Sequence, residues 1–115
     1  MPIKKDKPLI LLISKYIDRI IEFTDGLTLE EFSESQITYD ACVLNLLNIG
    51  ETLKKVSKGL KNKYPNIEYK KIIGLRNIIA HHYEAIEPYR VFQFAKNDLP
   101  KLKTEIEKIL NNAPN

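Results

Sequence analysis

The sequence predicts an all-α protein, an up-and-down bundle of four main helices with one short additional helix. Apolar residues recur three and four positions apart along most of the chain, which is the spacing of one helix face. No segment alternates between apolar and polar residues as a half-buried strand would. A length of 115 residues suits one core, so we expect a single domain over residues 1–115 with a frayed tail at 111–115.

A first helix is predicted from about Lys7 to Phe23. Pro8 suits an early helical position, and the apolar residues after it lie on one face. These residues are Leu9, Leu12, Ile13, Tyr16, Ile17 and Ile20. The helix should end near Gly26. Thr28 and Glu31 have the spacing of a capping box, so the short helix is expected to open at Thr28 and run through Phe32.

The second long helix is predicted from about Thr38 to Leu60, because its apolar residues are spaced alternately three and four apart. They are Tyr39, Cys42, Leu46, Ile49, Leu53, Val56 and Leu60. A seam of this kind suits antiparallel packing in a bundle. Asn45, Asn48 and Thr52 form a thin polar line along the same helix. Buried amides need hydrogen-bond partners, so this line could serve the core, a dimer contact or a functional site.

Two further helices complete the predicted bundle. Pro65 ends the second helix, and a third is expected from about Ile67 to His82. The last should run from about Pro88 to Leu110. Pro100 is expected to kink or restart this helix, with Asp98 as the cap of its second half.

The positive charge of the chain is concentrated in one segment. Residues 1–53 hold five Lys/Arg and nine Asp/Glu, a net charge of −4. Residues 54–76 hold eight Lys/Arg and one Asp/Glu, a net charge of +7. Residues 77–115 hold five of each, so the three segments sum to +3. The lysines of interest in the middle segment are Lys54, Lys55, Lys58, Lys70 and Lys71. They form either an ordinary solvated helix face or a basic patch that attracts phosphates with salt-dependent affinity.

Composition argues against a membrane protein and against a disulfide-stabilised one. No apolar run approaches the roughly 20 residues that a bilayer-spanning helix needs, and no signal-peptide cleavage pattern is present. Cys42 is the single cysteine, which excludes an internal disulfide and a thiolate metal cluster. We expect it to be a small core residue, and we expect a cytoplasmic protein.

A polar cluster interrupts the most apolar helix, in the stretch GLRNIIAHHYEAI at residues 74–86. An unpaired buried polar group costs roughly 1–3 kcal/mol, so these side chains need a physical reason. At 100° per residue, Asn77 and His81 share a face, and Arg76 completes a wedge of about 140°. Tyr83 lies near the helix end, where its hydroxyl can reach the mouth of a cleft. The surrounding apolar residues favour a helix in the interior or between two surfaces.

These residues also have purely structural interpretations. Arg76 could pair with Glu51, and Tyr83 could simply pack at a helix end. A lone His81 would more often be structural than catalytic. A metal site is rejected, because adjacent His81 and His82 point about 100° apart and no zinc-type spacing is present. We therefore predict no metal and no other cofactor.

The chemistry of the cluster suits RNA as a substrate. The guanidinium of Arg76 can bind two phosphate oxygens and stabilise charge that develops during cleavage. The imidazole of His81 can move a proton near neutral pH, and Asn77 could orient it or hold a phosphate oxygen. RNA supplies its own nucleophile, the 2′-hydroxyl. Because cleavage benefits from both an acid and a base, a symmetric dimer would usefully supply a second arginine and histidine.

The segment RNIIAHHY at residues 76–83 fits the signature R-N-x-x-x-H-x-Y. The chain thereby resembles the HepT-like ribonuclease toxins of the HEPN superfamily. The similarity extends to YDACVLNLLNIGETLKKVS (39–57), KYPNIEYKKIIGLRN (63–77) and DLPKLKTEIEKIL (98–110). Two departures lie outside the signature. Tyr69 stands where many relatives have tryptophan, and Asn48 where glutamine or an aliphatic residue is common.

The resemblance implies a HEPN-like bundle of four to five helices that forms a homodimer, with the two motifs across a shared cleft. It implies a metal-independent endoribonuclease that leaves a 2′,3′-cyclic phosphate. Arg76 and His81 would carry the chemistry, with support from Asn77. Glu51, Asn45 and Asn48 are the further residues expected to support the site.

The resemblance also implies a partner. Family members are usually toxins encoded beside a minimal nucleotidyltransferase antitoxin, which can transfer AMP to the motif tyrosine, here Tyr83. A bulky anionic adduct there would block RNA and compete for Arg76. The alternative is a non-catalytic helical module that docks a nucleotidyltransferase or binds nucleotides with the same cluster. A third possibility is a purely structural bundle.

Overall fold

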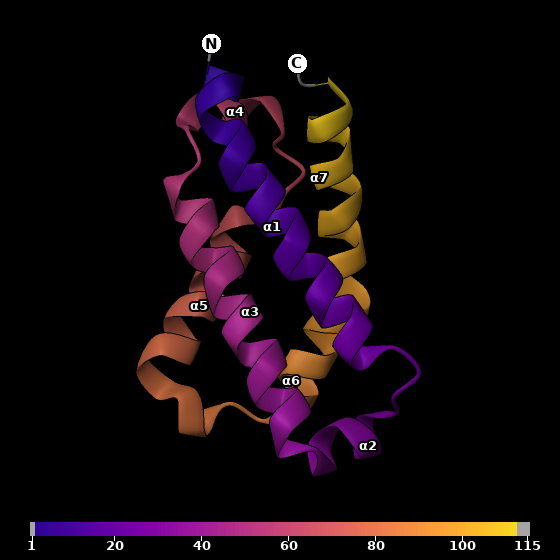
Figure 1. Ribbon diagram of the computed structural model, residues 1–115. Coiled ribbons are helices and arrows are strands. Elements are labelled where there is room, and N and C mark those ends of the chain that lie inside the picture. Colours follow the sequence, from indigo (N-terminus) through magenta and orange to yellow (C-terminus); the bar gives the residue numbers. More distant parts are fainter. Residues whose placement is uncertain (1, 113–115) are drawn as a thin grey trace.

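Four long helices run alternately up and down the molecule (Figure 1). The computed structural model describes residues 2–112, with side chains from residue 5 onward. The long helices are α1 (Pro2–Thr24), α3 (Gln36–Lys55), α5 (Tyr69–His82) and α7 (Leu99–Asn112). The short elements between them are α2 (Leu29–Glu34), α4 (Lys58–Lys63), the 3₁₀ turn η1 (Tyr83–Ala85), α6 (Pro88–Gln93) and the π turn η2 (Phe94–Asp98). Residues 2–112 contain no strand, and the predicted all-α bundle is confirmed.

The core is built by one apolar face of each long helix, but the four faces contribute unequally. α1, α3 and α7 each bury several large side chains, among them Ile13 and Ile17, Leu46 and Ile49, Leu99 and Ile106. α5 buries only Ile72 and Ile79, and it packs mainly against α3. Of the two placements that the sequence left open for this helix, the interior or between two surfaces, the single chain does not show the first. The outer face of α5 remains uncovered.

The first two predicted elements are present with longer bounds. α1 begins at Pro2, so Pro8 lies inside the helix and not in its first turn. Gly26 follows the helix with φ +72°, a left-handed conformation that a side chain would strain. Thr28 and Glu31 form the predicted capping box at the start of α2. Apolar periodicity thus located α1, and the capping-box spacing located α2.

The second predicted helix is in fact two helices. α3 ends at Lys55, and the extended backbone of Val56 turns the chain into α4. Ser57 caps α4 by accepting a hydrogen bond from the backbone N–H of Leu60 at 3.2 Å. The carboxylate of buried Asp6 in α1 accepts hydrogen bonds from Ser57 N (3.0 Å) and Ser57 Oγ (2.5 Å). This contact joins residues 51 positions apart and fixes the turn between α3 and α4. The apolar spacing along residues 38–60 is a local pattern, so it could not predict this turn.

The last predicted helix also differs in detail. A π turn precedes Pro100, and the backbone N–H of Leu99 bonds to the carbonyl of Phe94. α7 begins at Leu99, so the α-helix restarts beside Pro100, as the sequence predicted. Asp98 does not cap α7, because its carboxylate pairs with Lys71 of α5 at 2.9 Å. α7 continues to Asn112, so the predicted tail began too early, and residues 113–115 lie outside the described part of the chain.

Cys42 is a core residue, as the sequence indicated. It is fully buried among the apolar side chains of α3, and this burial raises the pKa of its thiol to about 11. A thiol with so high a pKa is protonated at neutral pH and is a poor nucleophile. No helix within residues 2–112 is both long and apolar enough to cross a bilayer.

Asp6→Ala is expected to lower the free energy of unfolding by about 2–3 kcal/mol, because it leaves the Ser57 donors without their buried charged acceptor. Urea denaturation followed by circular dichroism measures this change. The matched control is Asp18→Ala, whose carboxylate forms an exposed ion pair with Lys103 at 3.1 Å. That variant should lose less than about 1 kcal/mol. Equal losses in the two variants would contradict the role given to Asp6.

Candidate functional site

The site begins with a close approach between α3 and α5, which lie side by side (Figure 1). Gly50 of α3 is buried against Arg76 of α5. A Cβ atom on Gly50 would lie 2.3 Å from Arg76 Cβ and 2.8 Å from Arg76 Cγ, which is closer than van der Waals contact allows. The glycine therefore lets the stem of the arginine lie directly on the backbone of α3.

Two side chains hold the guanidinium of Arg76. Its Nη2 lies 2.6 Å from Oε2 of Glu51, and its Nη1 donates a hydrogen bond to Oδ1 of Asn77 at 2.9 Å. The contact with Glu51 is an ion pair without a well-aligned hydrogen bond. Nε of Arg76 is buried and has no acceptor among the described residues. The pairing of Arg76 with Glu51, which the sequence suggested, is thus present and leaves one donor unused.

The histidines lie on the other flank of the motif. His81 and His82 form the last turn of α5 and are exposed, as is Asn77. Because five residues separate Arg76 from His81, their side chains leave the helix about 140° apart. Arg76 is turned toward α3, whereas His81 faces solvent. No hydrogen bond joins the two within the part of the chain that the structure describes.

Tyr83 lies just past α5, at the start of η1. Its hydroxyl donates a hydrogen bond to Oδ1 of Asp40 near the start of α3. This bond raises the pKa of Tyr83 to about 12, because losing the phenolic proton would place two negative charges together. The ring lies 6.0 Å from that of Tyr39, whose hydroxyl donates to the carbonyl of Ile86 at 3.2 Å. Both rings therefore hold η1 against α3.

Asp40 is the site residue that sequence reasoning missed. It precedes Glu51 by eleven residues, which is close to three helical turns, so both carboxylates lie on one flank of α3. The spacing of these two carboxylates is the only sequence signal for Asp40. It becomes informative only when α5 is known to lie along that flank of α3.

The two amides expected to support the site are not brought to it. Asn45 is buried and donates a hydrogen bond to the carbonyl of Ala41 at 2.8 Å, within its own helix. Its Oδ1 is buried without a donor among the described residues. Asn48 leaves α3 about 160° away from Gly50, which is the side turned from α5. Of the three supporting residues predicted on α3, the structure brings only Glu51 into contact with the motif.

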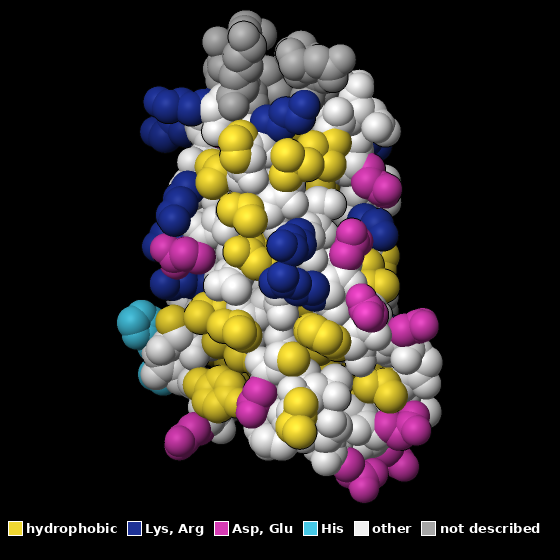
Figure 2. Space-filling view, in the orientation of Figure 1, with side chains coloured by type: hydrophobic (Ala, Val, Ile, Leu, Met, Phe, Trp, Pro, Cys, Tyr) yellow, Lys and Arg dark blue, Asp and Glu magenta, His cyan; other side chains and the backbone are white. Residues whose placement is uncertain are grey.

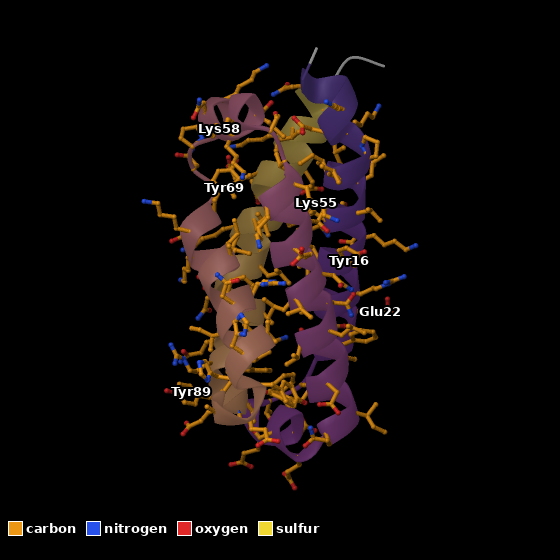
Figure 3. All side chains as sticks on the ribbon, turned by 90° about the vertical axis from the view of Figure 1, so that its left-hand side faces the viewer. Tyr16, Glu22, Lys55, Lys58, Tyr69 and Tyr89 are labelled. Carbon is orange, nitrogen blue, oxygen red and sulfur yellow. The ribbon has the colours of Figure 1, made fainter. Side chains whose placement is uncertain are left out.

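The five lysines of the predicted basic patch lie at the surface. Lys54, Lys55, Lys58, Lys70 and Lys71 are all exposed, and Lys71 is also paired with Asp98. Figure 2 shows Lys and Arg side chains along the same edge of the molecule as the histidines. Lys55 and Lys58 lie in the half of the bundle that holds α4 (Figure 3). In residues 2–112, no three His, Cys, Asp or Glu side chains come together as a metal site.

A helical bundle that carries an R-N-x-x-x-H-x-Y segment at the end of its third long helix has the HEPN-like architecture. The family model described as "Ribonuclease HepT-like" matches residues 13–109. The chain belongs to the HepT-like ribonuclease family.

Curated relatives agree with this assignment. The chain is 36% identical over 112 residues to "Putative RNase MJ1216" of Methanocaldococcus jannaschii, covering 97% of this chain and 93% of the relative. A second protein of that organism, "Putative RNase MJ0125", is 35% identical and 97% of each chain is covered. "Probable ribonuclease HepT" of Thermococcus cleftensis is 29% identical, with 84% of this chain and 88% of the relative covered. No solved structure matches the chain significantly.

Gly50→Ala is expected to destabilise the protein by about 1–3 kcal/mol, because the added methyl group would push α5 away from α3. Gly74→Ala is the matched control in α5, since a Cβ there meets no atom within 4 Å. Alanine favours a helix over glycine by up to about 1 kcal/mol, so this control should be neutral or stabilising. Urea denaturation of both variants measures the difference. A Gly50→Ala protein as stable as the parent would show that the close approach is unimportant.

Proposed function

We propose that this protein is a metal-independent endoribonuclease and acts as the toxin of a toxin–antitoxin pair. The observation that carries the proposal is the arrangement of Arg76, which α3 holds in place, beside the exposed Asn77 and His81 of a family signature. The family assignment and the names of the relatives support ribonuclease activity. We also propose a cytoplasmic location, where this chain would meet an RNA substrate.

The proposed reaction is transfer of the phosphate within the RNA. The 2′-oxygen attacks the adjacent phosphorus while its proton passes to a base. A bond forms between O2′ and phosphorus, the bond from phosphorus to O5′ breaks, and an acid protonates O5′. The products are a 2′,3′-cyclic phosphate and a free 5′-hydroxyl. Imidazoles of His81 suit the proton transfers, and the guanidinium of Arg76 suits the phosphate charge.

A homodimer would complete this site. One chain offers one Arg76, and its His81 is turned away from that guanidinium by about 140°. The outer face of α5 also carries exposed Ile78, which borders an open groove of about 570 Å³ between α5 and α6. Exposed Tyr89 lines the same groove and points outward (Figure 3). Charged residues, among them Lys70 and Arg90, also line this groove, and Ile78 leaves α5 about 160° away from Arg76. The groove lies beside the histidines, so a second copy of this chain packed on Ile78 and Tyr89 would bring a second imidazole to the site.

The proposed antitoxin is a minimal nucleotidyltransferase that transfers AMP to Tyr83. The side chain is 39% exposed, so another protein can reach its hydroxyl. An attached nucleotide would add bulk and negative charge two residues beyond His81. RNA phosphates would then be repelled from the cleft.

A second candidate is the non-catalytic module that docks a nucleotidyltransferase or binds nucleotides. The ion pair between Arg76 and Glu51 favours this non-catalytic module, because a carboxylate already binds the guanidinium that would otherwise bind a phosphate. The two candidate functions differ in whether the protein cleaves RNA catalytically. Purified protein without its partner should cleave RNA under the first proposal, whereas the second predicts partner binding and no cleavage.

Arg76→Ala and His81→Ala should each lower the rate of RNA cleavage by about 10²–10⁴-fold, through lost charge stabilisation and lost proton transfer. The assay is cleavage of labelled RNA in EDTA, with circular dichroism as the check of folding. His82→Ala is the matched control, because it removes an equally exposed imidazole outside the signature. The control should cleave like the parent. A loss of activity in His82→Ala together with an active His81→Ala would reverse the assignment.

Ile78→Arg should convert the dimer into a 13.3-kDa monomer, because a charge would be buried at the proposed contact. Sedimentation equilibrium measures the mass. Leu11→Arg changes a similarly exposed apolar residue on α1 and should leave the dimer intact. A parent protein that is monomeric at assay concentration, or a dimer broken only by Leu11→Arg, would refute the proposed contact face.

A further inference from the structure

Asp40 binds the one atom of the motif that the proposed modification would change. Its Oδ1 accepts a hydrogen bond from the hydroxyl of Tyr83 and a second from Nε2 of Gln36 at 2.8 Å. Asp40 is exposed, and no lysine or arginine among the described residues forms an ion pair with it. The carboxylate of Asp40 therefore has no cationic partner among the described residues, and the amide of Gln36 holds it against the phenolic hydroxyl.

A structural role explains this arrangement only in part. The hydrogen bond ties η1 to the start of α3, but the ring of Tyr83 already packs 6.0 Å from the ring of Tyr39. Tyr39 separately holds the end of η1 through the carbonyl of Ile86. An exposed hydrogen bond adds roughly 1 kcal/mol or less to such a contact. A serine or glutamine at position 40 could also accept this hydrogen bond, more weakly and without placing a charge there.

We propose that Asp40 is the proton acceptor when the hydroxyl of Tyr83 receives AMP from ATP. This inference rests on the regulation proposed above. The phenolic oxygen attacks the α-phosphorus of ATP, and a bond forms between that oxygen and phosphorus. The bond from the α-phosphorus to the bridging oxygen of the β-phosphate breaks, so pyrophosphate leaves. The phenolic proton passes to the carboxylate of Asp40 and then to solvent.

The electrostatics of the pair define how the proton moves. The pKa of Tyr83 is raised to about 12, so the free protein does not hold a phenolate in advance. The proton must leave while the bond to phosphorus forms, when the oxygen becomes far more acidic. A carboxylate already hydrogen-bonded to a hydroxyl nucleophile performs this task in protein kinases, where the catalytic aspartate accepts the proton of the substrate hydroxyl.

The surroundings of Tyr83 leave room for the incoming nucleotide. An open groove of about 270 Å³ lies beside it, and its walls include Gln36, Tyr39 and Pro88. After the transfer, Asp40 loses its proton to solvent and again carries a negative charge. It then repels the newly attached phosphate, which favours movement of the adduct away from α3.

The experiment measures the rate of AMP transfer by intact mass, using the full-length protein, ATP and a minimal nucleotidyltransferase of the class proposed above. Asp40→Asn keeps the size of the side chain and an oxygen acceptor but cannot take the proton. We expect its rate to fall about 10²-fold or more, with an unchanged KM for ATP. Glu87→Gln is the matched control, because it removes one exposed charge four positions after Tyr83 and does not line the groove beside Tyr83. It should react like the parent.

The remaining outcomes separate the inference from the regulation on which it rests. A parent protein that gains no AMP contradicts both. A parent that gains AMP at the same rate as Asp40→Asn overturns the role of Asp40 and leaves the regulation intact. Titration calorimetry against the transferase distinguishes a contact role. If Asp40→Asn binds the partner correspondingly more weakly, Asp40 is a docking residue and the proposal fails.

Discussion

The contact between Gly50 and Arg76 is the constraint on which the arrangement of the site depends. α5 buries only two apolar side chains, so its position is set largely by how closely its backbone can approach α3. The missing side chain at Gly50 lets the arginine stem lie flat against α3 and leaves the guanidinium at the edge, between Glu51 and Asn77. The helical repeat then directs His81 outward. One small residue on α3 thereby determines which motif side chains face inward and which face solvent.

α3 places a carboxylate at each end of the motif. Glu51 meets the guanidinium of Arg76, and Asp40 meets the hydroxyl of Tyr83. Eleven residues of helix separate the two carboxylates, a rise of about 16 Å along one flank. The first carboxylate orients a cation that is proposed to bind phosphate, and the second lies on the proposed acceptor of AMP. Nuclease and control functions are thus proposed to share a single supporting helix.

Apolar periodicity was sufficient to predict the four long helices, because each must bury one face. It could not predict where α3 stops, because Ser57 is held by the buried carboxylate of Asp6, 51 positions earlier in the chain. The same limit applies to the site. Arg76, Asn77, His81 and Tyr83 are recognisable as a local motif, whereas Asp40 becomes meaningful only through a contact between α3 and η1. The pairing of Asp98 with Lys71, in place of a helix cap, is another contact between distant segments.

The one-sided packing of α5 has a consequence for the energetics of the bundle. Local unfolding requires least free energy where few apolar side chains are buried, and α5 is supported mainly by one neighbour. Of the four long helices, α5 is therefore the one that can detach from the bundle most readily, and it carries the motif. A molecule that covers the outer face of α5 adds contacts to this weakly supported helix. Binding to that face is therefore coupled to the rigidity of the motif.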